Sequence, residues 1–316
     1  MSGQFAADNA CCKVSAIVNN PERSMQVAHS VESDAYPFEI NRIGDVAGAE
    51  IIGLDLSKPI DTATRDAIMR AFLEHHVLVF RDQDLTKDQQ AAFSENFGTL
   101  EHHVGRLPNG EPFPIVHTVT NLGPDGKPLG EKMGKGNFHW HTDKSYHEVP
   151  SLMTMLHAKQ VPADGGDTQF ANTRMGYAAL PEATKDLIAE MKAEHSWEAS
   201  RRNTKSPPAT EEQKRERPPV THPVVRTHPD TKDKILYVGC HVSHIHDMPR
   251  DESDDLLAEL MDHTTQPKFV YSHRWRKGDY VMWDNRCLLH RASPNFDTAN
   301  EARVLHRTVI IGTKPY

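Results

Sequence analysis

From residue 152 onwards, the chain contains a series of short strand-like segments that are separated mostly by turns rather than helices. Their apolar residues alternate with polar ones or form short apolar runs, as in half-buried and fully buried strands. One helical pattern, at 251–263 with Asp251 as its expected cap, interrupts them. This predicts a mainly β fold of the α+β class, a barrel or jelly-roll sandwich with helices packed outside it. The expected strands are 152–158, 167–171, 222–227, 234–239, 267–273, 279–283 and 303–311.

The chain before residue 152 is expected to supply the outer helices and the first strands. Thr86 and Gln89 have the spacing of a capping box at a helix start. Asp61 or Thr62 can cap an earlier helix, and the apolar run that follows it predicts a buried strand. The expected elements are strands 38–43, 49–56, 77–80 and 115–119, and helices that begin at 61–62, 86 and about 173 and end at 76, 98 and about 193.

The domain organisation follows from composition along the chain. The polar residues 1–35 contain no apolar signal-peptide core and are expected to be a disordered leader. Residues 36–316 are expected to form a single domain, although the length would also suit two average domains. Segments near 104–137 and 201–219 are rich in Gly, Pro or charged residues, which predicts two mobile insertions.

Composition and charge exclude several classes of protein. Hydrophobic residues make up 37% of the chain, and no apolar run approaches the roughly 18–20 residues of a membrane span. The net charge of −8 argues against a nucleic-acid partner but allows a small anionic substrate held by one or two buried arginines. The four cysteines have neither disulfide nor zinc-knuckle spacing, so a cytoplasmic location is expected. The sequence does not distinguish a monomer from a homo-oligomer.

The triplet His141-Thr142-Asp143 and the later His290 supply the candidate metal ligands. Two imidazoles and one carboxylate on one face of a metal leave the opposite face open, as in non-haem Fe(II) oxygenases. A lone His-x-Asp is also common by chance in a chain with 20 histidines. Zinc would suit the same three side chains, so the ligand types alone leave the metal open.

Other histidines are expected to lie outside the ligand set. If 139–143 is an extended strand, His139 shares a face with the triplet's His and Asp. The set is complete once His290 is counted, so His139 is expected to support the ligands or to lie at the surface. Adjacent pairs such as His75-His76 lack a carboxylate at the right local spacing and are expected to be surface or hydrogen-bonded residues.

Arg303 and Arg307 are the candidate anion-binding residues. Positions four apart on a strand project from the same face, so both guanidinium groups are expected to reach one cavity. Arginine suits fork-like pairing with carboxylates or sulfonates in a water-poor pocket. The turn Gly165-Gly166-Asp167-Thr168 could add a hydroxyl group at Thr168, although alone it predicts only a hairpin.

Four ordered motifs closely resemble those of the taurine dioxygenase/2,4-dichlorophenoxyacetate dioxygenase family of Fe(II)- and 2-oxoglutarate-dependent oxygenases. The resemblance runs from about residue 38 to the C-terminus. It implies the fold of that family, a double-stranded β-helix, which is a cupin-like jelly roll. The motifs are Trp140-His141-Thr142-Asp143, Gly165-Gly166-Asp167-Thr168, Trp283-Asp284-Asn285-Arg286 with His290, and Arg303 to Arg307.

The resemblance also implies a role for each matching residue. The iron ligands of the family correspond to His141, Asp143 and His290. The pair that holds the distal carboxylate of 2-oxoglutarate corresponds to Thr168 and Arg303. The residues that contact the substrate correspond to His103, Asn137 and, for its anionic group, Arg307.

Departures from the taurine enzyme's pattern concern the substrate pocket. Arg106 stands where that enzyme has a tyrosine, and Ser200-Arg201 replaces its Ser-Phe pair. Ser-Arg resembles the phenoxyacetate enzymes, which nevertheless lack a histidine at the position of His103. The resemblance therefore implies a hybrid pocket in which Arg106 and Arg201 also contact the substrate, and it leaves taurine itself in doubt.

The implied activity is hydroxylation of a small anionic organic compound, namely a sulfonate, alkyl sulfate or aryloxyalkanoate, with Fe(II), 2-oxoglutarate and O₂. Succinate and CO₂ would be the coproducts, and the hydroxylated product would undergo C–O or C–S cleavage. Two alternatives stay open: a zinc hydrolase that uses the same two histidines and aspartate, and a non-catalytic jelly-roll protein that binds an anion. Consumption of 2-oxoglutarate that depends on substrate would separate the dioxygenase from both.

Overall fold

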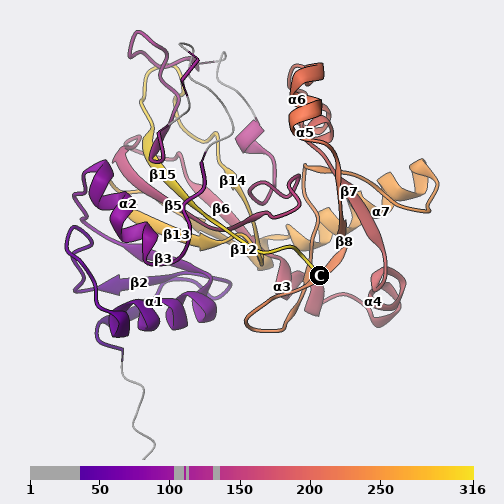
Figure 1. The fold of residues 1–316 in the computed structure, drawn as a ribbon, viewed down its shortest axis with the longest axis horizontal. Helices are drawn as coiled ribbons and strands as arrows, with labels where there is room; N and C mark the ends of the chain where they lie inside the picture. Colours follow the sequence, from indigo (N-terminus) through magenta and orange to yellow (C-terminus); the bar gives the residue numbers. More distant parts are fainter. Residues whose placement is uncertain (1–35, 103–109, 112–113, 131–135) are drawn as a thin grey trace, which may run out of the picture. The chain divides into compact units, whose positions relative to one another are not determined.

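The largest sheet of the protein has seven strands and is antiparallel except where β2 meets β3 (Figure 1). The structure is a computed structural model and describes residues 36–102, 110–111, 114–130 and 136–316. The strand order is β1–β2–β3–β13–β5–β15–β4, so β13, β5 and β15 lie in the interior of the sheet. The strands are β1 (Glu39–Arg42), β2 (Ala49–Ile52), β3 (Val77–Phe80), β4 (His117–Thr120), β5 (Ser151–Gln160), β13 (Tyr280–Asp284) and β15 (Val304–Ile311).

A three-stranded antiparallel sheet packs against one face of the large sheet. It consists of β12 (Val270–His273), β6 (Thr168–Asn172) and β14 (Leu288–Ala292), with β6 in the middle. Phe170 and Leu288 from this sheet share a buried cluster with Val281, Trp283 and Leu305 from the large one. Two antiparallel sheets around one apolar layer form a jelly roll, which confirms the predicted fold class.

Helices α1 (Thr62–His75) and α2 (Lys87–Glu95) cover the other face of the large sheet (Figure 1). Successive strand residues point to opposite faces, so Val281 packs between the sheets while Met282 packs against the helices. Both helix starts are as predicted. The Asp61 carboxylate accepts a hydrogen bond from Thr64 N, and a capping box between Thr86 and Gln89 begins α2.

A third buried cluster lies beyond β14 and joins the jelly roll to further helices and two small sheets. Ala171 and Leu289 from the jelly roll meet Leu180, Ile188 and Leu260 there. The elements around this cluster are α3 (Thr173–Ala178), α4 (Glu182–Ile188), α7 (Arg250–Thr264), β7 (Lys192–His195), β8 (Val220–Pro223), β11 (Val242–Ile245), β9 (Val225–Thr227) and β10 (Lys234–Leu236).

Several local predictions were wrong. The single helical region from 173 to 193 is divided into α3 and α4 because Pro181, which lacks an N–H donor, begins a new helix, and β7 already starts at Lys192. Helix α7 is preceded by Pro249 without a side-chain cap, so Asp251 lies in its first turn, where a negative charge suits the helix dipole. β7, β11 and β14 were not expected from the sequence.

The segment near 201–219 contains regular structure. α5 (Trp197–Asn203) ends within it, and α6 (Glu211–Glu216) follows with a capping box between Thr210 and Gln213. α6 packs on α5, and both lie well away from α1 and α2 in Figure 1. The polar composition of the segment had predicted a mobile insertion, and neither helix was identified from the sequence.

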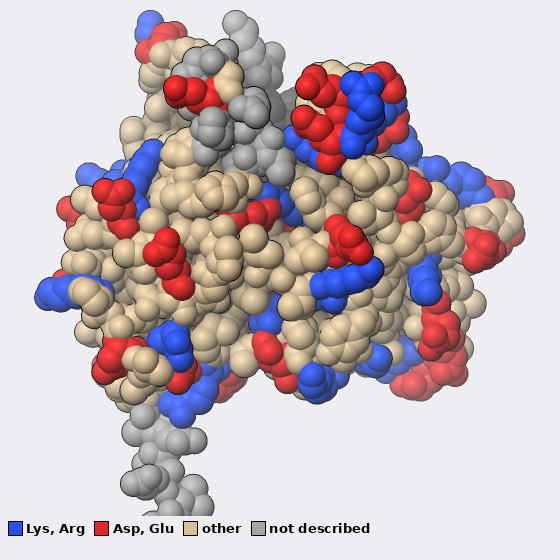
Figure 2. Space-filling view, viewed as in Figure 1, with Lys and Arg blue, Asp and Glu red and all other residues tan. Residues whose placement is uncertain are grey.

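The surface of the protein carries charges of both signs. Acidic and basic side chains are interspersed over the face shown in Figure 2, with much uncharged surface between them. Among the residues that the structure describes, no helix combines the length and the apolar character needed to cross a membrane.

Candidate active site

Two of the three proposed metal ligands meet through a backbone bridge. His141 N donates to the carbonyl oxygen of His290 at 3.1 Å, and His290 N donates to that of His141 at 2.7 Å. Asp143 follows in a turn, and one ligand atom of each of the three residues lies within 4.8 Å of the others. Residues 139–143 do not form one extended strand, so the condition under which His139 would share a face with the two ligands is not met, and His139 lies outside the group.

Both imidazoles offer a nitrogen lone pair. His141 Nδ1 lies 2.7 Å from the carbonyl oxygen of His139, which can only accept, so Nδ1 carries the proton and Nε2 keeps its lone pair. His290 Nε2 lies 3.9 Å from Asp143 Oδ2. Burial lowers the pKa of both histidines below the usual value, so the neutral, ligand-competent form dominates at neutral pH.

The Asp143 carboxylate is oriented by two side chains. Thr154 Oγ1 donates to Oδ2 at 2.5 Å, and Arg307 Nη2 lies 2.7 Å from Oδ1. Asn285 Nδ2 in turn donates to Thr154 Oγ1 at 2.9 Å, which leaves the Thr154 proton for Asp143. Burial alone would raise the pKa of Asp143, but Arg307 and the neighbouring imidazoles hold it well below the usual value. The carboxylate stays ionised, as a metal ligand must.

Thr168 and Arg303 line a cavity that His141, Asp143 and His290 also line. Thr168 Oγ1 accepts from Trp275 Nε1 at 3.0 Å and from Arg303 Nη2 at 3.2 Å, so its own proton is free to donate. Burial lowers the pKa of Arg303 to about 10, which still leaves a cation at neutral pH. A carboxylate entering here would meet a buried positive charge and a hydroxyl donor. The contribution of Trp275 was not predicted from the sequence.

The glycine pair before Thr168 is required by close packing of the turn. Gly165 has a φ of +77°, and a Cβ on it would lie 2.0 Å from the carbonyl oxygen of Asn295. Gly166 N donates to Asn295 Oδ1 at 2.8 Å, and its own carbonyl oxygen accepts from Arg303 Nε at 3.0 Å. Without side chains at these two positions, the turn can bring Thr168 next to Arg303.

The candidate metal group lies between two cavities. The smaller one connects it to Thr168 and Arg303, and the larger one has a volume of about 390 Å³ and extends to α5 and α6. Asn137 and Arg307 line both cavities, and Arg201 lines the larger one. The other two predicted substrate contacts, His103 and Arg106, lie outside the described residues. The larger cavity is also lined by Lys144, Tyr146, Trp197, Gln213, Arg217 and His241, none of which was predicted.

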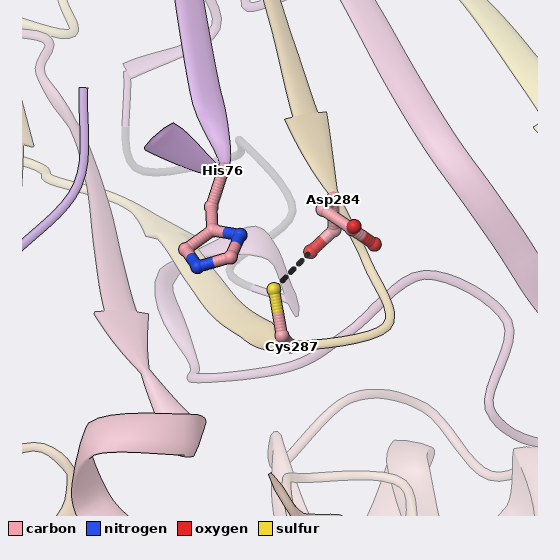
Figure 3. Close-up of side chains that lie close together, drawn as sticks. All are labelled: His76, Asp284 and Cys287. Carbon is pink, nitrogen blue, oxygen red and sulfur yellow. Dashed lines mark hydrogen bonds between the residues drawn. The ribbon is translucent and has the colours of Figure 1, made fainter. Parts of the chain in front are cut away.

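A second group of potential ligands lies at the end of β13. His76, Asp284 and Cys287 are buried and bring one ligand atom each within 4.8 Å of the others (Figure 3). The Asp284 carboxylate is already occupied, since Arg286 donates to both oxygens and His228 Nε2 lies 3.1 Å from Oδ2. The Cys287 thiol points to the backbone carbonyl of Asp284 at 4.0 Å (Figure 3), and burial raises its pKa well above the usual value.

The fold and the first group define a class of protein. A jelly roll with two imidazoles and one carboxylate near a buried arginine has the arrangement of a metal-dependent oxygenase with an organic-acid cosubstrate. The sequence matches the family described as "Taurine catabolism dioxygenase TauD, TfdA family" over residues 39–309, and the chain belongs to this family.

Individual relatives agree with this assignment. The chain is 39% identical to the alpha-ketoglutarate-dependent 2,4-dichlorophenoxyacetate dioxygenase of Cupriavidus pinatubonensis over 259 residues, 79% of this chain and 90% of the relative. It is 32% identical to the alpha-ketoglutarate-dependent sulfate ester dioxygenase of Pseudomonas putida, with 91% and 92% of the two chains covered. The crystal structure of AAD-2 in complex with Mn(II) and N-oxalylglycine superposes with a TM-score of 0.79 at 37% identity, covering 88% of this chain and 98% of that one.

The protein is therefore a 2-oxoglutarate-dependent dioxygenase. The predicted double-stranded β-helix fold is confirmed by the same comparisons. The comparisons support neither of the two alternative functions, a zinc hydrolase and a non-catalytic anion-binding protein.

Proposed function

We propose that the protein hydroxylates a small anionic organic substrate at an Fe(II) centre held by three side chains. The observation that carries the proposal is the group of His141, Asp143 and His290 between two cavities, one of which ends in Arg303. The proposed ligands are His141, Asp143 and His290; the proposed 2-oxoglutarate-binding residues are Thr168 and Arg303; the proposed substrate contacts are Asn137, Arg201 and Arg307, with His103 and Arg106.

The chemistry of the donor set supports a bound divalent ion. Asp143 is ionised, His141 has a free Nε2 lone pair, and His290 Nε2 faces the same carboxylate. Neutral imidazole and carboxylate suit Fe(II) in a site with open positions. When bound, Fe(II) supplies the redox chemistry that couples decarboxylation of 2-oxoglutarate by O₂ to hydroxylation of a C–H bond.

The chain's own residues position the two organic reactants. The Arg303 guanidinium and the Thr168 hydroxyl would bind the distal carboxylate of 2-oxoglutarate, so that its keto-acid end points towards the metal group. Arg307, which lines both cavities, would bind the substrate anion beside the metal group. Trp283 and Leu156 line the smaller cavity and exclude water from the reacting centre.

Relatives that act on aryloxyalkanoates and sulfate esters support an anionic substrate with a cleavable C–O bond. Hydroxylation of the carbon next to an ether oxygen gives a hemiacetal, which collapses to a phenol and a carbonyl compound. A sulfate ester would release sulfate by the same step, and a sulfonate would release sulfite. The cationic lining of the larger cavity suits all three substrate classes. The cytoplasmic location remains a proposal from the cysteine pattern.

The test measures succinate formation by protein that has been loaded with known amounts of metal and 2-oxoglutarate. Anaerobic protein is titrated with Fe(II) and 2-oxoglutarate and then exposed to O₂ with aryloxyalkanoates, alkyl sulfates or sulfonates. We expect at least one class to stimulate succinate release with an equivalent amount of phenol, sulfate or sulfite. A zinc-loaded sample should be inactive. Substrate cleavage without 2-oxoglutarate consumption would contradict the proposal.

Arg307→Leu tests the substrate anion site. We expect the KM of the stimulating substrate to rise about 10- to 100-fold, because a charge-assisted hydrogen bond is lost. Succinate release per substrate oxidised should also rise, since a poorly placed substrate uncouples the two half-reactions. Arg276→Leu, at an exposed position that lines neither cavity, is the control. An unchanged KM and an unchanged coupling ratio in Arg307→Leu would contradict this role.

A further inference from the structure

One wall of the larger cavity is built by α5, by Gln213 of α6 and by Arg217, and its two arginines have no close carboxylate among the described residues. α5 supplies Trp197 and Arg201, and Arg217 directly follows α6. His141, Asp143 and Arg307 also line this cavity. We propose that Arg217 forms a second anion subsite, so that the substrate carries an acidic group at each end. This inference rests on the proposed function and narrows its substrate class.

The Arg217 guanidinium is buried without a close counter-charge. Its side chain is 9% exposed, and Nε is buried with no hydrogen-bond partner among the described residues. Arg217 Nη2 lies 4.0 Å from Glu216 Oε2, and the Glu216 side chain is 55% exposed and therefore well solvated. By contrast, Arg286, whose side chain is 4% exposed, bonds to both Asp284 and Asp230. A buried cation without a carboxylate is costly, and a ligand anion would offset that cost.

Two of the cationic side chains that line the larger cavity have no close carboxylate partner among the described residues. Lys144 is paired with Glu101, and Arg307 is paired with Asp143. Arg201 and Arg217 form no close ion pair with a described carboxylate, although Arg201 Nε donates to the carbonyl oxygen of Pro207 at 2.7 Å. The excess positive charge therefore lies at the α5–α6 wall rather than beside the metal group.

Trp197 fixes the position of both cations. The guanidinium carbons of Arg217 and Arg201 lie 5.1 and 5.6 Å from its ring centroid, within cation–π range. Gln213, one turn before Arg217, also lines the cavity and can donate a hydrogen bond. A carboxylate, sulfonate or sulfate at the far end of the substrate would meet preorganised donors.

The proposed substrate is therefore a small dianion. One acidic group lies close to the carbon that is hydroxylated, and the second lies at the far end of the molecule. A ring carboxylate on an aryloxyalkanoate and a terminal carboxylate on an alkyl sulfate both satisfy this description. In either case the first anion would bind at Arg307 and the second at Arg217.

Matched substrate pairs test the subsite. 4-Carboxyphenoxyacetate is compared with 4-nitrophenoxyacetate, its isosteric monoanion, and 6-sulfooxyhexanoate with hexyl sulfate. We expect the dianion to have about a tenfold lower KM for succinate release in the pair that is turned over. Calorimetric Kd values, measured with Mn(II) and N-oxalylglycine bound, should show the same ratio in that pair. If no compound is turned over, that result counts against the proposed function alone. The calorimetric Kd values still test the second anion subsite in that case.

Variants separate Arg217 from general charge effects. Arg217→Gln should reduce the dianion preference to about unity, and Arg217→Lys should retain part of it because the charge remains. Arg215→Gln, at an exposed position in α6, is the control and should keep the tenfold ratio. Equal Kd values within both pairs in the unmodified protein, or a dianion preference that survives in Arg217→Gln, would overturn the subsite.

Discussion

Within the described residues there are two buried groups of three potential metal ligands, and they differ in what their atoms already bind. In the first, His141, Asp143 and His290 all line the smaller cavity, His141 and Asp143 also line the larger one, and the group keeps free lone pairs. In the second, the Asp284 carboxylate accepts hydrogen bonds from both Arg286 and His228. The Cys287 thiol beside it is protonated because burial raises its pKa. Proximity of ligand types is therefore insufficient, since a metal also needs free lone pairs and access.

The second group is better explained as a structural ion-pair cluster. Arg286 bonds to Asp284 through three nitrogen atoms and to Asp230 Oδ2 at 2.5 Å, which ties the turn after β13 to the loop after β9. His76, also buried, has no hydrogen-bond partner for either ring nitrogen among the described residues. The expectation that His76 lies at the surface or is hydrogen-bonded was therefore wrong.

Loss of a ligand from the first group should have the largest effect. Asp143→Ala should abolish metal binding and substrate-dependent succinate release, because two imidazoles alone hold the ion weakly. Metal content after gel filtration and succinate assays measure both effects. Asp186→Ala, at an exposed position on α4, is the control and should retain one ion and full turnover. Full activity in Asp143→Ala would refute the ligand assignment.

The second group should matter for stability instead. Asp284→Asn leaves the Arg286 cation with only Asp230 and should lower the free energy of unfolding by about 3–5 kcal/mol. Urea unfolding of the metal-loaded protein measures this loss, and the folded variant should still bind one ion. If Asp284→Asn lost the metal while keeping its stability, the roles of the two groups would be reversed.

The same substitution has a pH signature. Burial raises the pKa of Asp284, but Arg286 and His228 outweigh it and hold the folded-state pKa well below the usual value. The unfolded-state pKa is about 3.9, so the stabilisation is complete above that value and is lost as pH falls through the folded-state pKa. The stability difference between the protein and Asp284→Asn should be constant from pH 7 to 5 and should shrink below about pH 4. A difference that grew in acid would contradict this sign.

Cys287→Ala should produce the smallest effect. Removing one buried sulfur atom should cost about 1 kcal/mol of stability, comparable to deleting a core methyl group. Metal stoichiometry should not change, because the thiol is not a ligand. A drop in bound metal in this variant would show that the second group also holds an ion.

Most of the fold could be predicted because its elements follow local rules. The capping residues Asp61 and Thr86 begin the expected helices, and β3 and β13 appear where apolar runs predicted buried strands. β14 was missed because its sequence, from Leu288 to Ala292, is short and its pairing partner β6 is distant in the chain.

The site could be predicted only in part. The ligand candidates were identified from residue types and a family resemblance, whereas the backbone bridge between His141 and His290 is a tertiary contact with no local signal. Trp275 and Arg217 contribute through packing of segments far apart in sequence, so no motif pointed to them. Gln213, three residues after Thr210, was a visible capping-box signal for α6 that the polar composition obscured.

Anomalous diffraction from crystals grown with Mn(II) and N-oxalylglycine tests the central claim most directly. The account predicts one strong manganese peak within coordination distance of His141, Asp143 and His290, and none beside His76 and Cys287. The N-oxalylglycine carboxylate should contact Arg303 and Thr168. Absence of a peak at the first group, or an equally strong peak at the second, would contradict the account.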